Sequence, residues 1–331
     1  MRQLNHSSGD FVADRRAAYA RAAADDLAFA EAAELMQQAL ELAPGWTAGW
    51  CLLGDYRAEA GDLAGAIAAY EELARLDAEG IFGAALKLAA RGAAPAPRGT
   101  ETSYVEALFD DYATRFEAEL VGRLGYSAPQ HLAGLVADEL ARCGAEQVGH
   151  AIDLGCGTGL MGERLRRSAS FLEGVDLSTA MVEEAGRKGI YDRLEKAELV
   201  AFLGAHAGAV DLLAAADVLN YCGELRPVLQ AAARVLVPGG LFAFTLELHG
   251  GTEPLLLGPT LRYAHNAELA MAGCRAAGFE IVQQAAAVLR HDRGAPVEGL
   301  LVLLRRPATV AELPGLVVVE DDDSAVQRLD G

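Results

Sequence analysis

A short glycine-rich stretch in the middle of the chain limits most strongly what this chain can fold into. In residues 151–159, an apolar segment ends in Asp153 and is followed by three alternating glycines, Gly155, Gly157 and Gly159. This pattern predicts a buried strand, a sharp turn and a helix directly afterwards. Because glycine lacks a Cβ atom and the first N–H groups of a helix are free, such a turn can bind a nucleotide.

The segments after this turn alternate between apolar strands and helices, which predicts a parallel sheet with helices on both faces. Residues 171–177 form the expected second strand, and Ser178 is placed to cap the helix that follows. Asp176 ends this strand, about 20 residues beyond Gly157. An acidic side chain there lies beside the glycine turn and can accept hydrogen bonds from both ribose hydroxyls of a nucleotide.

The spacing of the glycines argues against a dinucleotide. The dinucleotide fingerprint requires Gly-x-Gly-x-x-Gly, and Leu160 stands at the position of its last glycine. The run from Asp153 to Gly159 instead resembles the first motif of class I S-adenosylmethionine-dependent methyltransferases. Residues 210–219 are similar to the fourth strand of that family, and Val-Pro-Gly-Gly at 237–240 is similar to its turn into strand five.

The resemblance implies an α/β fold with a Rossmann-like class I methyltransferase sheet. The sheet would be mostly parallel and would close with two strands, at about 279–289 and 297–304, after a helix capped by Asn266. The implied cofactor is S-adenosyl-L-methionine. By similarity its binding residues would be Asp153, Gly155, Cys156, Gly157, Gly159, Asp176, Leu177, Met181, Glu198, Leu199 and Asp217.

Within this set the resemblance implies separate roles. Asp153 would approach the ammonium end of the cofactor, Leu177 and Met181 would flank the adenine, and Glu198 would accept from the adenine amino group. Glutamates at strand ends are also common without a ligand. Asp217 would lie beside the sulfonium, with plain capping of the next turn as the alternative.

The residues expected on the acceptor side follow from the chemistry of methyl transfer, which is an in-line displacement. Catalysis depends mainly on holding the nucleophile and the methyl group in line in a dry pocket, and a base is optional. A base is required only for a poor nucleophile such as a phenol or hydroxyl. His265 is the candidate base, Asp217 is the other candidate catalytic residue, and Arg262 is a candidate carboxylate anchor. The alternative for the histidines and Arg262 is a surface loop without a chemical role. The expected acceptor-binding residues are Tyr112, Phe116, Asn220, Tyr221, Arg262, Tyr263 and His265.

A helix is expected over residues 104–124, ahead of a second helix over 129–143. Its apolar residues recur at every fourth position, which places them on one helical face: Leu108, Tyr112, Phe116, Leu120 and Leu124. This face either packs on the following domain or forms a lid that covers a ligand with Tyr112 and Phe116.

The N-terminal part of the chain contains an internal repeat. Four residues recur about 34 positions later, so that Ala32, Met36, Ala39 and Leu42 correspond to Ala66, Tyr70, Leu73 and Leu76. This period, with Trp50, Leu53 and Gly54 in the second copy, resembles a tetratricopeptide repeat. We expect about two repeats, the first incomplete, and a closing helix over 81–91. The two tryptophans, Trp46 and Trp50, either pack between helices or line a groove for a partner protein.

The composition divides the chain into segments with different properties. We expect a mobile polar N-terminus at 1–15, a tetratricopeptide-like helical module at 16–92, a linker rich in proline at 93–100, a methyltransferase domain at 101–308 and an acidic flexible tail at 309–331. This order resembles a family of bacterial predicted methyltransferases with an N-terminal tetratricopeptide region, a resemblance that supplies no substrate.

The overall composition narrows the classes of partner. A net charge of −19 argues against binding to nucleic acid, because such affinity rests on clustered Lys and Arg. The 5 cysteines are dispersed, and neither CxxC pairs nor histidines at zinc-ligand spacing occur, so we expect no metal site. No apolar run reaches the length of about 18 residues that a membrane span needs, which favours a cytoplasmic protein.

Four functions remain open from the sequence. The leading hypothesis is methyl transfer to a small molecule. The alternatives are a protein methyltransferase that recruits its target through the N-terminal helices, an adaptor that binds S-adenosylmethionine without catalysis, and, more distantly, a nicotinamide oxidoreductase.

Overall fold

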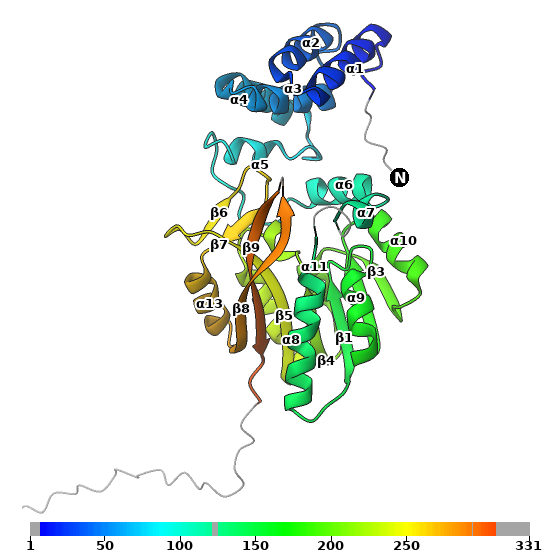
Figure 1. Cartoon of the computed structure of the whole chain (residues 1–331), viewed down its shortest axis with the longest axis vertical. Helices are drawn as coiled ribbons and strands as arrows, with labels where there is room; N and C mark the ends of the chain where they lie inside the picture. The colour runs from blue at the N-terminus through cyan, green and yellow to red at the C-terminus, as the bar shows by residue number, and fades with distance from the viewer. Residues whose placement is uncertain (1–6, 121–124, 293, 309–331) are drawn as a thin grey trace, which may run out of the picture.

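The computed structural model describes residues 7–120, 125–292 and 294–308, and every structural statement below refers to these ranges. It shows an all-helical module followed by an α/β domain (Figure 1). Residues 1–6 of the expected mobile N-terminus and all of the expected acidic tail, 309–331, lie outside the described ranges. No helix in the described ranges is long and apolar enough to cross a membrane.

Four helices form the N-terminal module: α1 (Phe11–Asp25), α2 (Phe29–Leu42), α3 (Thr47–Glu59) and α4 (Leu63–Leu76). Each packs against the next, and the repeated residues Ala32, Met36, Tyr70 and Leu73 are completely buried between them. A Cβ atom at Gly54 would lie 2.3 Å from the ring of Tyr70, so only glycine permits this approach of α3 to α4. The repeat therefore corresponds to two helix pairs, whose tetratricopeptide character remains a prediction.

The first helix begins at Phe11, earlier than the composition suggested. Asp10 causes this early start, because its carboxylate accepts hydrogen bonds from the N–H groups of Val12 and Ala13. Both tryptophan side chains belong to the packing of this module, and the Trp50 indole also donates to the carbonyl of Pro44. Packing thus accounts for the tryptophans without a partner.

A short helix, α5 (Ala84–Ala89), joins the two parts of the chain and lies between them in Figure 1. Ala84 and Leu88, one helical turn apart, pack on the core of the helical module. Leu86 lies on the other face, where it packs with Leu261 and Tyr263 of the α/β domain. The two faces of α5 therefore fix the helical module to the α/β domain.

The α/β domain contains the expected sheet. Its parallel strands have the order β3-β2-β1-β4-β5, and β9 then pairs antiparallel with both β5 and β8. The strands are β1 (Val148–Leu154), β2 (Ala169–Asp176), β3 (Arg193–Lys196), β4 (Val210–Ala215), β5 (Leu236–Leu248), β8 (Glu280–Asp292) and β9 (Ala295–Arg305). This arrangement confirms the Rossmann-like sheet that is mostly parallel and closes with antiparallel strands.

Helices cover both faces of this sheet. The helices are α8 (Ala128–Arg142), α9 (Leu160–Leu165), α10 (Thr179–Lys188), α11 (Leu199–Ala205), α12 (Arg226–Val235) and α13 (Ala267–Ala276), with short 3-10 helices η1 (Arg166–Ser168) and η2 (Leu219–Tyr221). Neighbouring strand residues enter opposite cores, as the alternation of a strand requires. Ala151 packs with α8 and α9, whereas Ile152 packs with α11, α12 and α13.

Two expectations differ from the structure. The single helix expected over 104–124 is divided into α6 (Thr102–Tyr112) and α7 (Phe116–Leu120), and Leu124 lies outside the described residues. The segment before α13 is not a surface loop, because β7 (Tyr263–His265) pairs with the end of β5 and β6 (Leu255–Leu257) pairs with β7. Strands of three residues are too short to show an alternating pattern in the sequence.

Candidate functional site

A cavity of about 330 Å³ lies at the carboxyl ends of β1, β2 and β4, beneath α6 and α7. It brings together many of the residues singled out in the sequence. These are Gly155, Gly157, Asp176, Leu177, Met181, Glu198, Leu199, Asp217, Tyr112, Phe116, Tyr221 and Arg262. The carboxyl edge of a parallel sheet at the point where strand order reverses is the usual ligand site of this fold class.

The glycine turn follows β1 and forms one wall of the cavity. Gly155 and Gly157 have φ angles of 63° and 53°, a region that side chains other than glycine rarely adopt. A Cβ atom at Gly155 would also lie 2.5 Å from Val218. Cys156 and Gly159 do not line the cavity. The Cys156 side chain is buried, which raises the pKa of its thiol, and Gly159 is the residue directly before α9.

Asp176 lies at the end of β2, as expected, with its carboxylate at the cavity wall. Its oxygens accept hydrogen bonds from the backbone N–H groups of Gly157 and Ser178, both at 2.8 Å. Burial raises the pKa of Asp176, against the effect of these hydrogen bonds. The glycine turn and the end of β2 are thus bonded to each other through this one side chain.

Asp153 lies behind the glycine turn rather than on the cavity wall. It is the penultimate residue of β1, is 1% exposed, and accepts a 2.7 Å hydrogen bond from the hydroxyl of Tyr191. Its Oδ1 atom is buried and has no hydrogen-bond partner among the described residues. Burial raises the pKa of Asp153 to about 7.

The other side of the cavity, beyond Asp176, is mostly apolar. Leu177, Met181 and Leu199 line it, and Met181 is 1% exposed. Glu198 is the polar group here, and its carboxylate also caps α11 by accepting from the N–H of Ala201 at 2.8 Å. The structure thus shows both a structural role for Glu198 and a position at the cavity.

Aromatic side chains of α6 and α7 cover the cavity. The rings of Tyr112 and Phe116 are 5.5 Å apart, and Phe109 lies 6.3 Å from Phe116 and 5.3 Å from Tyr221, all in edge-to-face contact. Phe109 and Tyr126 also line the cavity but were not singled out from the sequence. The apolar face of α6 and α7 therefore covers the cavity and also packs on the α/β domain.

Three acidic side chains of α6 and α7 attach these helices to the nucleotide side of the cavity. Glu106 is 2.7 Å from Lys196, which ends β3. Asp110 accepts from the Ser178 hydroxyl at 2.5 Å and from the N–H of Ala180 at 3.1 Å. Sequence reasoning missed these contacts, because their partners lie far along the chain.

The third of these side chains, Glu117, contacts the glycine turn itself. Its carboxylate accepts from the Thr158 hydroxyl at 2.6 Å and pairs with Lys188 at 2.6 Å. Lys188 also pairs with Glu163 at 2.8 Å. Hydrogen bonds from Thr158 and Lys188 outweigh burial and lower the pKa of Glu117, so this group is ionised at neutral pH.

A buried ionic network lies behind the acceptor end of the cavity. Arg290 of β8 is 3% exposed and donates to both oxygens of Asp217 at 3.0 Å and to Glu247 at 2.5 Å. Burial acts to raise the pKa of Glu247, but Arg290 and Arg262 outweigh it and lower that pKa. Asp217 has a φ of 61°, a strained conformation of the kind found at functional sites. A lone arginine in the apolar strand at 285–290 was the one sequence signal for Arg290.

Arg262 is the basic residue of this network that reaches the cavity. Its Nε atom donates to the hydroxyl of Tyr221 at 2.9 Å, and its guanidinium lies 5.3 Å from the centre of that ring. Its Nη1 atom is 3.6 Å from Glu247. The structure therefore holds the guanidinium plane in one orientation at the cavity wall.

Three expected acceptor residues do not line the cavity. Asn220 is 1% exposed and donates to Asp217 and Glu247, and the Tyr263 hydroxyl donates to the carbonyl of Pro97 at 2.6 Å. His265 is 3% exposed, and its Nε2 atom lies 3.3 Å from the carbonyl of Gly223. Burial lowers the pKa of His265 to about 4, so its imidazole is neutral at pH 7.

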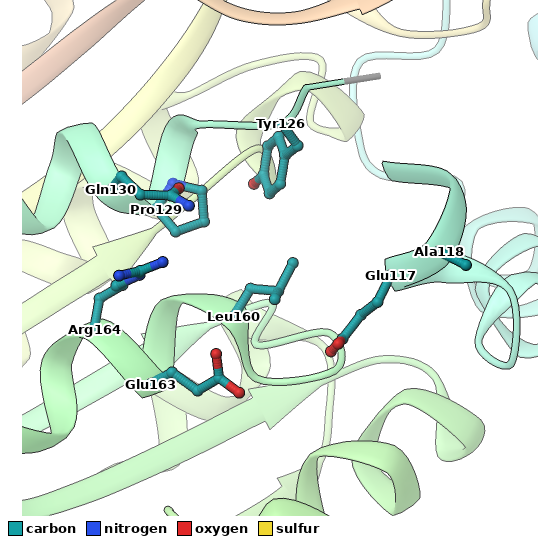
Figure 2. A pocket seen from close by; sticks show the side chains of 8 residues that line it. All are labelled: Glu117, Ala118, Tyr126, Pro129, Gln130, Leu160, Glu163 and Arg164. Carbon is teal, nitrogen blue, oxygen red and sulfur yellow. The ribbon is translucent and has the colours of Figure 1, made fainter. Parts of the chain in front are cut away.

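A second cavity of about 440 Å³ adjoins the first, between α7, α8 and α9. Figure 2 shows Glu117 and Arg164 on opposite sides of it. Tyr126 lines both cavities and donates to the carbonyl of Ala216 at 3.2 Å. Leu160, the residue after the glycine turn, also lies in its wall, so this cavity extends the site beyond that turn.

Comparison with known proteins identifies the class of domain. Residues 152–244 match a family model described as a methyltransferase domain. A malonyl-[acyl-carrier protein] O-methyltransferase of Enterobacter lignolyticus is 33% identical over 106 residues, which are 32% of this chain and 42% of that protein. A trans-aconitate 2-methyltransferase of Pseudomonas aeruginosa is 34% identical over 138 residues, which are 39% of this chain and 48% of that protein.

Among solved structures, the [4+2]-cyclase SpnF matches 64% of this chain and 98% of its own with a TM-score of 0.50 and 20% identity, which shows the shared fold. This chain spans less than half the length of these two curated relatives. The family match and the glycine turn together show a methyltransferase domain whose cofactor is S-adenosyl-L-methionine.

Proposed function

We propose that this chain transfers a methyl group from S-adenosylmethionine to an oxygen atom of a small carboxylic acid. The observation that carries the proposal is the continuous cavity from Asp176 to Arg262, covered by the aromatic residues of α6 and α7. It combines a nucleotide end and an acceptor end in one volume. That volume, about 330 Å³, is at the lower end of the range for small-molecule sites, which favours a small acceptor.

The residues at the nucleotide end fit the cofactor. In the proposed arrangement Asp176 accepts from the ribose hydroxyls, Leu177 and Met181 flank the adenine, and Glu198 accepts from the adenine amino group. The glycine turn leaves room for the methionine part, because Gly155 and Gly157, which line the cavity, carry no Cβ atoms. Asp153, whose Oδ1 atom has no partner among the described residues, is the candidate for the ammonium group. When bound, the cofactor supplies an electrophilic methyl group.

The acceptor end favours an anion. Asp217 and Glu247 already accept from Arg290, whereas the nearest acidic atom to Arg262 is Glu247 at 3.6 Å. A planar guanidinium held in one orientation binds a carboxylate through two parallel hydrogen bonds. A carboxylate is ionised at neutral pH and needs no base to act as the nucleophile. This agrees with the position of His265 away from the cavity, so we do not propose His265 as a base.

The remaining contribution of the chain is orientation and exclusion of water. Phe109, Tyr112 and Phe116 cover the cavity, and a dry site strengthens the contact between Arg262 and a carboxylate. Malonyl and trans-aconitate, the groups in the names of the two relatives above, both carry carboxylates, which supports this class of acceptor. The fold alone does not establish methyl transfer, since a cyclase shares it.

The test uses S-adenosylmethionine with a labelled methyl group and small carboxylic acids, each paired with its amide as a neutral control. We expect label in the acids only, as methyl esters that release labelled methanol in mild base. Arg262→Gln should raise KM for the acid about tenfold or more, because charge-assisted contacts contribute about 1.5–3 kcal/mol. Binding of S-adenosylhomocysteine should stay unchanged in this variant.

Two further variants serve as controls. Arg115→Gln removes an exposed arginine of the segment between α6 and α7 and should leave KM unchanged. Asp176→Asn should weaken binding of S-adenosylhomocysteine instead of acting on KM for the acid. Equal transfer to acids and amides, or an unchanged KM in Arg262→Gln, would contradict a carboxylate acceptor.

A second candidate is an acceptor carried on a partner protein that binds α1–α4. The position of the linker favours it, because Thr100 lines the cavity and the Tyr263 hydroxyl donates to Pro97, which brings the helical module close to the acceptor end. Removal of residues 1–80 would then lower kcat/KM for the protein-borne acceptor and leave a free small acceptor unaffected. Equal effects on both acceptors would exclude recruitment.

A further inference from the structure

Three metal-ligating side chains meet near the amino end of the sheet, away from the cavity at its carboxyl end. His150 lies near the start of β1, Glu173 lies within β2, and His206 follows α11. One ligand atom from each lies within 4.8 Å of the others. The positions are far apart in the chain, which is why the search for closely spaced ligands in the sequence found no metal site.

Two polar atoms of this cluster lack hydrogen-bond partners among the described residues, whereas His150 Nε2 and Glu173 Oε2 are hydrogen-bonded to each other. Glu173 is 1% exposed, and its Oε1 atom has no hydrogen bond among the described residues. The Nε2 atom of His206 is also buried without a partner. Arg193 approaches Oε1 to 3.2 Å as an ion pair, but without the geometry of a hydrogen bond. A buried polar atom without a partner is destabilising, and a bound ion would remove that cost.

One separation within this cluster suits a tetrahedral ion. His150 Nε2 and Glu173 Oε2 are 3.3 Å apart, close to the separation of about 3.3 Å between two ligands bound to Zn²⁺ at about 2.0–2.1 Å. Two imidazoles and one carboxylate are a donor set that suits Zn²⁺ and related divalent ions. We infer that His150, Glu173 and His206 bind one divalent transition-metal ion, with Zn²⁺ preferred.

The role of this ion would be structural. It would connect β1, β2 and the segment after α11, and none of the three ligands lines either cavity described above. The inference is therefore independent of the proposed methyl transfer.

Arg193 competes with the ion for Glu173. Its side chain is 55% exposed, and its Nη2 atom is 2.5 Å from Glu195, so it retains a partner when Glu173 binds a metal. Removal of its charge should therefore strengthen metal binding, whereas loss of a ligand should weaken it. Adventitious binding to surface histidines would show neither dependence.

The test is titration of the full chain, freed of metal with a chelator, with Zn²⁺ by calorimetry and with Co²⁺ by visible absorption. We expect one ion per chain and the absorption bands of tetrahedral Co²⁺. His206→Ala should weaken binding about tenfold or more, and Arg193→Gln should tighten it. The matched control is His131→Ala, which removes an exposed histidine of α8 and should change nothing.

Glu173→Gln provides a second ligand variant, and its fold is checked by circular dichroism because the residue is buried. If Glu173→Gln does not fold, the opposite effects of His206→Ala and Arg193→Gln decide the question. The inference is overturned if the wild-type chain binds no ion, or if His206→Ala binds as tightly as His131→Ala.

Discussion

Asp153 is buried, and among the described residues Tyr191 is the one side chain that donates a hydrogen bond to its carboxylate. Burial raises its pKa to about 7 from an ordinary value of 3.8. The folded chain therefore holds this proton more tightly than the unfolded chain does. The contribution to stability is fully present below about pH 4 and is lost as the pH rises to about 7, because the unfolded chain releases its proton first.

Asp153→Asn tests this pH dependence, because asparagine stays neutral and can still accept from Tyr191. Its free energy of unfolding relative to wild type should rise by roughly 2–3 kcal/mol between pH 5 and pH 8, at about 1.4 kcal/mol for each pH unit up to the folded pKa. Denaturant unfolding at both pH values, without cofactor, measures the change. A constant difference between the two proteins would show that Asp153 is ionised in the folded chain throughout.

The arginines at the acceptor end have different tasks, although both are held by acidic partners. Arg290 is buried and holds Asp217 and Glu247 in place, whereas Arg262 reaches the cavity. A change at Arg290 would leave Asp217 without its arginine partner and Glu247 with only the more distant Arg262, which is strongly destabilising for largely buried carboxylates. For this reason the role of Arg262 can be tested by substitution. A change at Arg290 would alter the stability of the fold and the function of the site together, so its effects could not be separated.

At the scale of elements, α6 and α7 belong to both ends of the cavity. Their acidic residues contact the nucleotide side, and their aromatic residues cover the acceptor side. Glu117 is central, because it contacts both Thr158 in the glycine turn and Lys188 at the end of α10. Loss of its charge should loosen α7 over the cofactor.

Glu117→Gln should therefore raise the dissociation rate of S-adenosylhomocysteine. The expected increase is only about two- to tenfold, because the Glu117 side chain is 42% exposed and solvent screens such pairs. Stopped-flow displacement measures this rate, and the difference from wild type should shrink in high salt. Asp111→Asn, which breaks an exposed pair with Arg115 on the same segment, is the control. Equal rates in wild type and Glu117→Gln would show that α7 does not retain the cofactor.

The elements that the sequence predicted well are those with local signals. The glycine turn, the caps Ser178 and Asn266 and the position of Asp176 each follow from neighbouring residues, and the structure confirms these positions. The features that the sequence did not predict depend on partners that are far away along the chain. Arg290 meets Asp217 only after the antiparallel strands close the sheet. His265 shows the reverse case, because a histidine in a polar stretch suggested chemistry, but β7 buries it away from the cavity.

For the whole molecule, we propose that the boundary between the two parts lies before α5, although one face of α5 also packs on the helical module. Leu86 is 3% exposed because Leu261 and Tyr263 of the α/β domain cover it. The carbonyl of Arg98 accepts from the N–H of Glu224, and that of Pro97 accepts from Tyr263. The segment from α5 to Thr100 therefore contacts the α/β domain through Leu86, Pro97 and Arg98, in addition to the contacts of α5 with the helical module.

Two truncations test this boundary. Removal of residues 1–80 keeps α5 and should leave Tm of the α/β domain within a few degrees of the full chain. Removal of residues 1–95 exposes Leu261 and Tyr263 and should lower Tm by about 10 °C or more, because loss of one large buried side chain costs about 2–5 kcal/mol. Calorimetry compares the two. Equal Tm values would mean that α5 contributes nothing to the α/β domain.

The attachment of residues 84–100 to the acceptor wall also bears on how such a chain can change during evolution. Two related genes could recombine within the proline-rich linker. The product would then combine the linker of one parent with the acceptor side of the other. The carbonyls of Pro97 and Arg98 accept hydrogen bonds from that side, so these contacts would join residues of different parents. A junction between α4 and α5 keeps these contacts within one parent. Exchange of N-terminal modules among relatives should therefore leave active proteins mainly when the crossover falls in residues 77–83.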